Sequence, residues 1–175
     1  MTDKQLNMFP ETRRTPSRSE NRGPAFTLTR TLPGSAQKVF DQWLIPVFLE
    51  KWLLGPHVGD DEILELSNSV RRGGEFEFVT RRQGAKTKVV GSYKELRIPQ
   101  RLAFSWQQGG NEAEELQVNA EFSDQGDKTR IKLTLSLPPD QADRKDEIKA
   151  QWVARCDALA TRLKSQERSK EANSD

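Results

Sequence analysis

Six segments in the middle of the chain carry the pattern of β-strands and follow one another with only short polar stretches between them. In the last two, residues 115–122 and 129–137, an apolar residue occupies every second position. A two-residue period is typical of a strand with one buried face, and short connections favour antiparallel neighbours. The pattern therefore predicts an antiparallel sheet with one wet and one covered face. The six segments are EILEL, GEFEFVTRR, TKVVGSYKEL, RLAFSWQQ, ELQVNAEF and TRIKLTLSL.

The cover for this sheet is predicted to be a long helix near the end of the chain. Asp140 follows two prolines and can cap a helix over residues 140 to about 164. At 1.5 Å per residue the helix would be roughly 36 Å long. Its apolar residues recur at steps of three or four and form one stripe. The stripe consists of Ile148, Trp152, Cys156, Leu159 and Leu163.

One strand and two short helices are predicted before the six segments. Residues 25–32 alternate apolar and polar side chains and are followed by Pro33 and Gly34. Ser35 can cap a first helix, and Pro46 separates it from a second. The resulting order is strand, two short helices, six strands and a long helix. This order predicts an α+β fold of the helix-grip type, in which a curved antiparallel sheet wraps the terminal helix.

The chain of 175 residues is long enough for one domain of ordinary size. Residues 1–24 are rich in Arg, Ser, Thr and Pro, so we predict a disordered N-terminal tail. The folded domain is predicted to span residues 25–165. The polar residues 166–175 are predicted to form a second disordered tail.

Composition excludes several classes of protein. The 28 basic and 26 acidic residues nearly balance, which gives no electrostatic reason to expect nucleic acid or a membrane surface as partner. The single cysteine cannot form an internal disulfide, and no apolar run approaches the roughly 20 residues that span a bilayer. No signal-peptide pattern precedes the domain. We therefore expect a soluble, monomeric cytoplasmic protein.

The glycine doublet at Gly73 and Gly74 precedes the strand that carries Phe76 and Phe78. Glycine tolerates positive φ angles and close backbone approach. The doublet therefore predicts a sharp turn at the start of this strand, which we interpret as a bend that brings the phenylalanines close to the long helix.

A set of residues spread over most of the chain resembles the START-like (SRPBCC) superfamily, and within it the branch named for the activator of the heat-shock-protein-90 ATPase. The resemblance implies a cavity between helix and sheet, which various members use for lipids, hormones, polyketides or other apolar molecules. One position departs from the branch, because Gln151 stands where members commonly have glycine before the tryptophan of the last helix. The matching residues are Arg30, Ala36, Val39, Phe40, Trp52, Arg72, Gly73, Gly74, Phe76, Phe78, GSYKEL at 91–96, PQRL at 99–102, FSW at 104–106, Thr129, Trp152, Leu159 and Leu163.

The leading hypothesis is a small-molecule binding domain for an apolar or amphipathic ligand, with no cofactor and no metal. Aromatic side chains can line such a pocket or simply fill the core. A binder is predicted to contain an enclosed apolar pocket of at least about 300 Å³. A packed interior would instead favour an interaction module that binds a chaperone in the stress response. The candidate ligand-binding residues are Trp52, Phe76, Phe78, Tyr93, Phe104, Trp106, Trp152 and Cys156.

A third hypothesis is an enzyme of the cyclase or hydrolase kind that uses the same cavity. Glu95 shares strand parity with Tyr93, so it is predicted to point inward if Tyr93 does, and an inward carboxylate needs a partner such as an arginine. The interpretation that we favour for Glu95 is a structural ion pair. His57, the only histidine, can act as an acid or base or can be plain loop surface. Cys156 is interpreted as core packing because no thiolate-stabilising neighbour is evident.

Overall fold

A computed structural model describes residues 23–54, 61–109 and 114–173. Its seven strands form one antiparallel sheet in the order β1-β7-β6-β5-β4-β3-β2, so the first and last strands are neighbours. The predicted helix-grip architecture is confirmed. The strands are β1 (Ala25–Pro33), β2 (Asp61–Asn68), β3 (Glu75–Arg82), β4 (Ala85–Arg97), β5 (Arg101–Gln108), β6 (Leu116–Asp124) and β7 (Lys128–Ser136).

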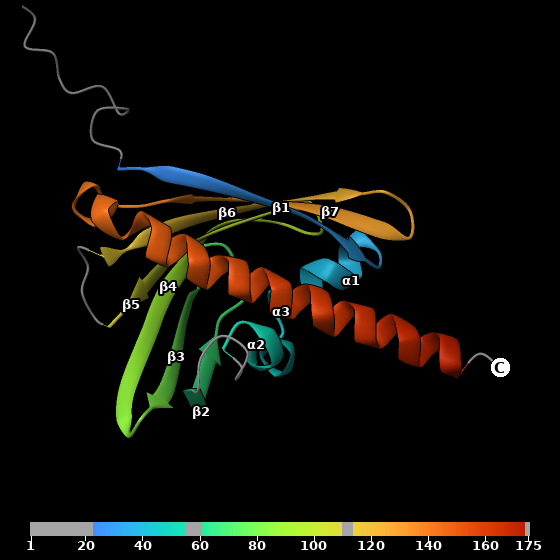
Figure 1. Ribbon diagram of the computed structural model, residues 1–175, viewed down its shortest axis with the longest axis horizontal. Helices are drawn as coiled ribbons and strands as arrows, with labels where there is room; N and C mark the ends of the chain where they lie inside the picture. The colour runs from blue at the N-terminus through green and yellow to red at the C-terminus, as the bar shows by residue number, and fades with distance from the viewer. Residues whose placement is uncertain (1–22, 55–60, 110–113, 174–175) are drawn as a thin grey trace, which may run out of the picture.

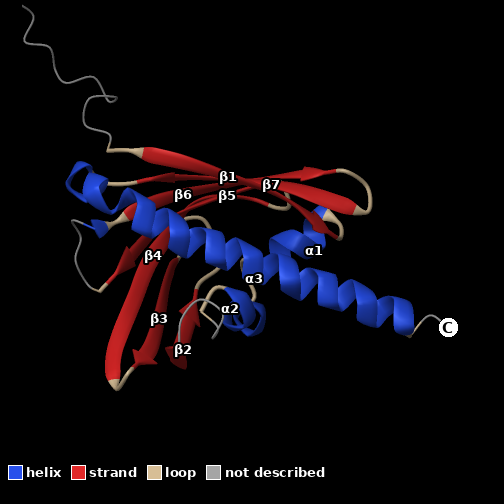
Figure 2. Ribbon diagram, viewed as in Figure 1, coloured by secondary structure: helices blue, strands red, loops and turns tan. Residues whose placement is uncertain are grey.

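The long helix α3 (Lys145–Ala172) crosses one face of the curved sheet (Figures 1 and 2). It packs on β1 and on the second short helix. All five residues of the predicted apolar stripe are buried, with Leu159 and Leu163 at 0% exposure. The stripe therefore faces the sheet, as the periodicity predicts.

Two short helices follow β1, as predicted. In α1 (Ala36–Asp41), the Lys38 backbone N–H donates to the Ser35 hydroxyl oxygen at 3.3 Å, which is an N-terminal cap. In α2 (Pro46–Trp52), Pro46 occupies the first helical position, where its missing N–H costs nothing. Both helices bury large side chains toward the sheet and α3, and these side chains include Phe40 and Trp52.

The end regions of α3 differ from the prediction. Residues 139–144 form a separate 3-10 helix, η3 (Pro139–Arg144), and the α-helix begins only at Lys145. The helix then continues to Ala172, so the predicted tail is helical over residues 166–172. Its last turns extend past the edge of the sheet (Figure 1). These residues are good helix formers without an apolar stripe, and a criterion based on apolar periodicity misses such a segment.

The glycine doublet builds the turn between β2 and β3. Gly73 has φ +79, and a Cβ atom on Gly74 would lie 2.0 Å from the Ser69 carbonyl oxygen. The Gly73 N–H donates to the Tyr93 carbonyl at 2.9 Å, and the Tyr93 N–H donates to the Gly74 carbonyl at 2.9 Å. The doublet thus attaches this turn to β4. The glycines therefore shape this turn and its hydrogen bonds to β4, and this explanation replaces the interpretation as a bend around α3.

Candidate functional site

The seven aromatic residues predicted to bind a ligand lie in one buried core, to which α2 contributes Trp52 and α3 contributes Trp152. Cys156 belongs to the same core. Phe76 stacks on Phe78 with ring centroids 4.9 Å apart and contacts Tyr93, Phe104 and Trp106 at 5.5–6.2 Å. Trp106 meets Trp152 edge-on at 5.3 Å. Trp52 joins the cluster through Trp43, whose ring centroid lies 4.6 Å away.

This aromatic cluster is packed. The space among its rings has a volume of about 10 Å³, close to the size of a single water molecule. This volume is far below the enclosed apolar pocket of at least about 300 Å³ expected of a binder. The aromatic side chains fill the core between sheet and helices, and a ligand would need to displace them to enter.

The polar atoms of Tyr93 and Trp52 are hydrogen-bonded within the protein, whereas Trp43 Nε1 is buried with no hydrogen-bond partner among the described residues. The Tyr93 hydroxyl donates to Asn68 Oδ1 at 2.6 Å, and Asn68 Nδ2 donates to the Leu44 carbonyl at 2.7 Å. Burial raises the pKa of Tyr93 to about 12, although the Asn68 hydrogen bond acts in the opposite direction. Trp52 Nε1 donates to the Gln42 carbonyl at 2.8 Å. Tyr93 and Trp52 are therefore held as structural residues.

Cys156 behaves as a small apolar side chain. It is 3% exposed, and burial raises the pKa of its thiol to about 11. A nucleophilic cysteine requires a thiolate near neutral pH. The geometry therefore agrees with core packing.

Of the two remaining catalytic candidates, the structure describes Glu95, which does not line the interior. Tyr93 pairs with Phe104 across β4 and β5, but a β-bulge shifts the register, and Glu95 pairs with Ala103. Because neighbours on β5 face opposite sides, Glu95 faces away from the aromatic cluster, and the parity prediction is wrong. His57 lies outside the described residues.

Glu95 has arginine partners on that outer face. Its carboxylate lies 3.2 Å from Arg97 Nε and 3.2 Å from Arg101 Nε. The structural ion-pair interpretation thus fits this glutamate.

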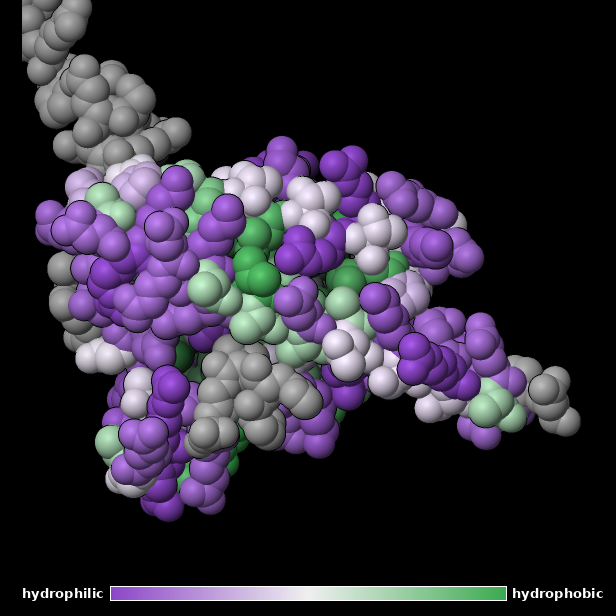
Figure 3. Space-filling view, in the orientation of Figure 1, coloured by the Kyte–Doolittle hydropathy of each residue, from purple (hydrophilic) through white to green (hydrophobic). Residues whose placement is uncertain are grey.

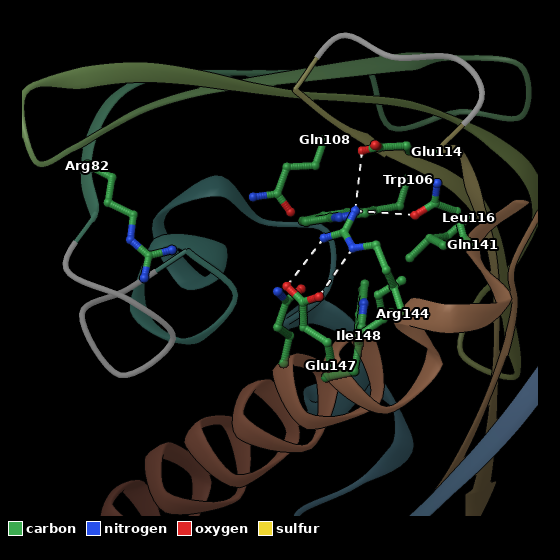
Figure 4. A pocket seen from close by; sticks show the side chains of 11 residues that line it. Arg82, Trp106, Gln108, Glu114, Leu116, Gln141, Arg144, Glu147 and Ile148 are labelled. Carbon is green, nitrogen blue, oxygen red and sulfur yellow. Dashed lines mark hydrogen bonds and ion pairs between the residues drawn. The ribbon is translucent and has the colours of Figure 1, made fainter.

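A solvent-connected hollow lies between the N-terminal part of α3 and the ends of β5 and β6. We call it the outer hollow, and its volume is about 300 Å³. Arg144 projects into it, with Arg82 on its far side and Gln108 between them (Figure 4). Its described lining residues are Arg82, Trp106, Gln108, Glu114, Leu116, Gln141, Arg144, Glu147, Ile148, Gln151 and Trp152.

Arg144 is tied into the wall of the outer hollow. Its Nε and Nη2 donate to the Glu147 carboxylate at 3.2 and 3.4 Å, and Nη1 donates to Gln141 Oε1 at 3.2 Å. The Glu114 carboxylate lies 3.6 Å from Nη1. The guanidinium holds the pKa of Glu147 below its usual value, mainly through the hydrogen bond. Arg144 is therefore already neutralised by the protein.

A second hollow of about 130 Å³ adjoins the outer one and shares Arg82, Gln108 and Gln151 with it. We call it the inner hollow and the two together the α3 cleft. Leu53, Leu54 and Val89 supply apolar wall, while Asp61 and Arg155 supply opposite charges. The remaining described lining residue is Thr80.

Arg155 is the unusual residue of the inner hollow, since it is charged yet only 6% exposed. Its guanidinium carbon lies 5.0 Å from the Trp106 ring centroid and 4.7 Å from that of Trp152. Both distances are within the range of cation–π attraction. Burial lowers the pKa of Arg155 to about 10, and Asp61 partly offsets this shift.

Sequence reasoning found the tryptophans of the cleft but missed Arg155. A signal was present, because Arg155 comes three residues after Trp152 and four before Leu159, on the apolar stripe. A basic residue at such a position is buried with partners or functional. Gln151, noted as the departure from the branch, lines both hollows.

Figure 3 shows one face of the molecule, which is largely hydrophilic and is interrupted by a few apolar side chains near its middle. Among the described residues, no helix combines the length and the apolar character needed to cross a membrane.

Solved structures share this fold. Protein Mll3558 from Rhizobium loti is 24% identical with a TM-score of 0.68, and the alignment covers 80% of this chain and 96% of that one. Protein CV1439 from Chromobacterium violaceum is 21% identical with a TM-score of 0.66, covering 80% and 97%. CalU16 from Micromonospora echinospora is 20% identical with a TM-score of 0.59, covering 84% and 82%.

No curated protein sequence gives a significant match. A family model does match, over residues 33–164, and it is described as activator of Hsp90 ATPase homolog 1-like protein. This range includes every helix and strand from α1 to β7 and most of α3. The chain therefore belongs to the activator of Hsp90 ATPase homolog 1-like family, a START-like branch with the helix-grip fold.

Proposed function

We propose that this protein is a small-molecule binding domain that takes an amphipathic ligand in the α3 cleft. The observation that carries the proposal is the cleft itself, which joins a hollow of about 300 Å³ to one of about 130 Å³. The larger volume reaches the lower end of the usual range for small-molecule sites, about 300–1,000 Å³.

The chemistry of the cleft walls suits a ligand with one apolar and one polar part. Trp106 and Trp152 line the wall with only 2% and 1% of their surface exposed, and Leu53, Leu54 and Val89 add aliphatic wall. Gln108 and Gln151 offer amide groups that can donate and accept hydrogen bonds. A purely apolar ligand fits this lining poorly, because it would desolvate the amides and the guanidinium groups without replacing their hydrogen bonds.

Amide NMR titration tests the proposal. We would titrate the labelled protein with a mixed library of fatty acids, sterols, flavonoids and aromatic acids. Saturable shifts are expected at Gln108, Gln151 and Trp152, which line the cleft. Smaller shifts are expected at Phe78 and Tyr93, which lie in the packed aromatic cluster.

Two outcomes would count against the cleft. Shifts centred on Phe78 and Tyr93 would mean that ligands open the aromatic cluster instead. A flat response across the whole library would remove the small-molecule function.

The packed interior and the family match support a second candidate, a module that binds an Hsp90-class chaperone through its outer surface. Stimulation of the chaperone's ATPase rate by the purified protein is the expected result under this candidate. A Gln151→Trp variant, whose new side chain would fill the cleft, should stimulate the chaperone ATPase as well as the wild type does. If the wild-type protein neither stimulates nor binds the chaperone, the chaperone-binding function is excluded.

We also propose that the protein acts as a cytoplasmic monomer, and its single cysteine, which cannot form an internal disulfide, suits a reducing compartment. Light scattering after size-exclusion chromatography is expected to give a mass near 20.0 kDa. A stable mass of twice that value would show a dimer.

A further inference from the structure

The buried guanidinium of Arg155 has donors that the protein leaves unused. Its Nε donates to the Leu53 carbonyl at 3.4 Å, which is long for a hydrogen bond. Its Nη1 is buried and has no hydrogen-bond partner among the residues that the structure describes. An arginine carries five N–H donors, and a buried donor without an acceptor is costly. Arg155 lines the inner hollow, so this hollow is the space from which an acceptor can approach the guanidinium group.

The charge of Arg155 also lacks a close counter-ion. Within the described part of the chain, no carboxylate forms an ion pair with it, whereas Arg144 has Glu114 and Glu147. The charge of Asp61 raises the pKa of Arg155, but the ion pair that Asp61 forms is with Arg82, whose Nε lies 3.8 Å from Asp61 Oδ1. The described lining of the inner hollow contains two arginines and one aspartate, so it carries one net positive charge.

The position of Arg155 is fixed before any ligand arrives. The rings of Trp106 and Trp152 lie on the guanidinium at 5.0 and 4.7 Å, and the two rings contact each other at 5.3 Å. A planar guanidinium held in one orientation can receive a carboxylate through two parallel hydrogen bonds without first losing side-chain freedom.

From these contacts we propose that Arg155 anchors the carboxylate of the ligand in the inner hollow, while the rest of the ligand lies in the outer hollow. This inference rests on the proposed function and specifies its ligand class, an amphipathic monocarboxylate. The volume of about 130 Å³ accommodates a carboxylate with the adjoining part of its chain, and the outer hollow of about 300 Å³ takes the remainder. Arg82, at the junction of the two hollows, adds a second positive charge along the path.

Isosteric probes separate the contribution of charge from that of shape. We would measure the affinity of the wild-type protein for octanoate and octanamide, and for phenylbutyrate and phenylbutyramide, by isothermal titration calorimetry. Each carboxylate is expected to bind at least about tenfold more tightly than its amide, a difference of about 1.4 kcal/mol.

Two arginine variants on the same helix form a matched pair. Arg155→Met keeps an unbranched apolar stem between the tryptophans and removes the donors. Arg162→Met is the control, because Arg162 stacks on Phe48 at 5.3 Å and bonds to Gln42 but lines neither hollow. Arg155→Met should lower carboxylate affinity at least about tenfold and leave amide affinity within about threefold, and Arg162→Met should change neither.

The possible failures are distinct. Equal binding of acid and amide by the wild-type protein would overturn the anchoring role of Arg155 and leave the proposed function standing. That wild-type comparison decides the question even if Arg155→Met does not fold. Binding of no probe, and of no member of the amphiphile library, would overturn both proposals.

Discussion

The Tyr93 hydroxyl shows how one residue links burial to protonation. Burial raises the pKa of this phenol to about 12, so the fold favours the neutral form over the phenolate. The associated stabilisation is fully present below pH 10, the value for a free tyrosine, and is lost as the pH rises from 10 toward 12. A shift of this size corresponds to about 2–3 kcal/mol.

Tyr93 is the only tyrosine in the chain, so its ionisation can be followed directly by ultraviolet absorbance. The folded protein is expected to titrate near pH 12 and the urea-unfolded protein near pH 10. Tyr93→Phe should abolish the absorbance change and flatten the fall in unfolding free energy over this range. Titration of the folded protein near pH 10 would contradict the burial of the hydroxyl.

The glycine doublet offers a second test at the scale of the residue. In Gly74→Ala, the new Cβ would lie 2.0 Å from the Ser69 carbonyl oxygen, so the backbone must shift, at a cost of about 2–3 kcal/mol. Gly73→Ala meets no atom within 4 Å and suffers only from its positive φ, a cost of about 1 kcal/mol. Urea unfolding measures both costs, and equal losses would refute the close-approach explanation for Gly74.

At the scale of the element, α3 consists of a buried part and an exposed continuation. Leu159 is fully buried, whereas the residues after Ser165 are polar and largely exposed. The periodicity of apolar residues predicted the first part and its orientation. It could not predict residues 166–172, because their helical state depends on local propensity and continuity with α3.

Leu159→Ala and a truncation after Ser165 should therefore differ in effect. The substitution removes buried methyl groups and is expected to cost about 2–5 kcal/mol. The truncation removes the Glu167 partner of Lys38, an ion pair at 3.1 Å with both side chains about one-third exposed, and should cost no more than about 1 kcal/mol. Urea unfolding midpoints of the Leu159→Ala variant and of the truncated protein measure the two losses. A truncation as harmful as Leu159→Ala would show that the end of α3 is needed for the core.

At the scale of the whole molecule, the strand order and the covering helix could be predicted because each element has its own periodicity. The burial of the aromatic residues was predicted for the same reason. Whether those rings enclose a cavity was not predictable, since that depends on ring packing among β3, β4, β5 and α2. The α3 cleft was also hidden, because Arg82, Gln108, Gln141 and Arg155 meet only in the folded chain.

If ligands occupy the α3 cleft, a side chain that fills the cleft should block their binding. Gln151 lines both hollows, so Gln151→Trp should occupy their junction. Ala150→Trp places the same side chain at an exposed position of the same helix and serves as the control. We would titrate a library member that binds the wild type into both variants by calorimetry. We expect at least about tenfold weaker binding to Gln151→Trp and unchanged binding to Ala150→Trp. Unchanged affinity in Gln151→Trp would show that the ligand binds outside the α3 cleft.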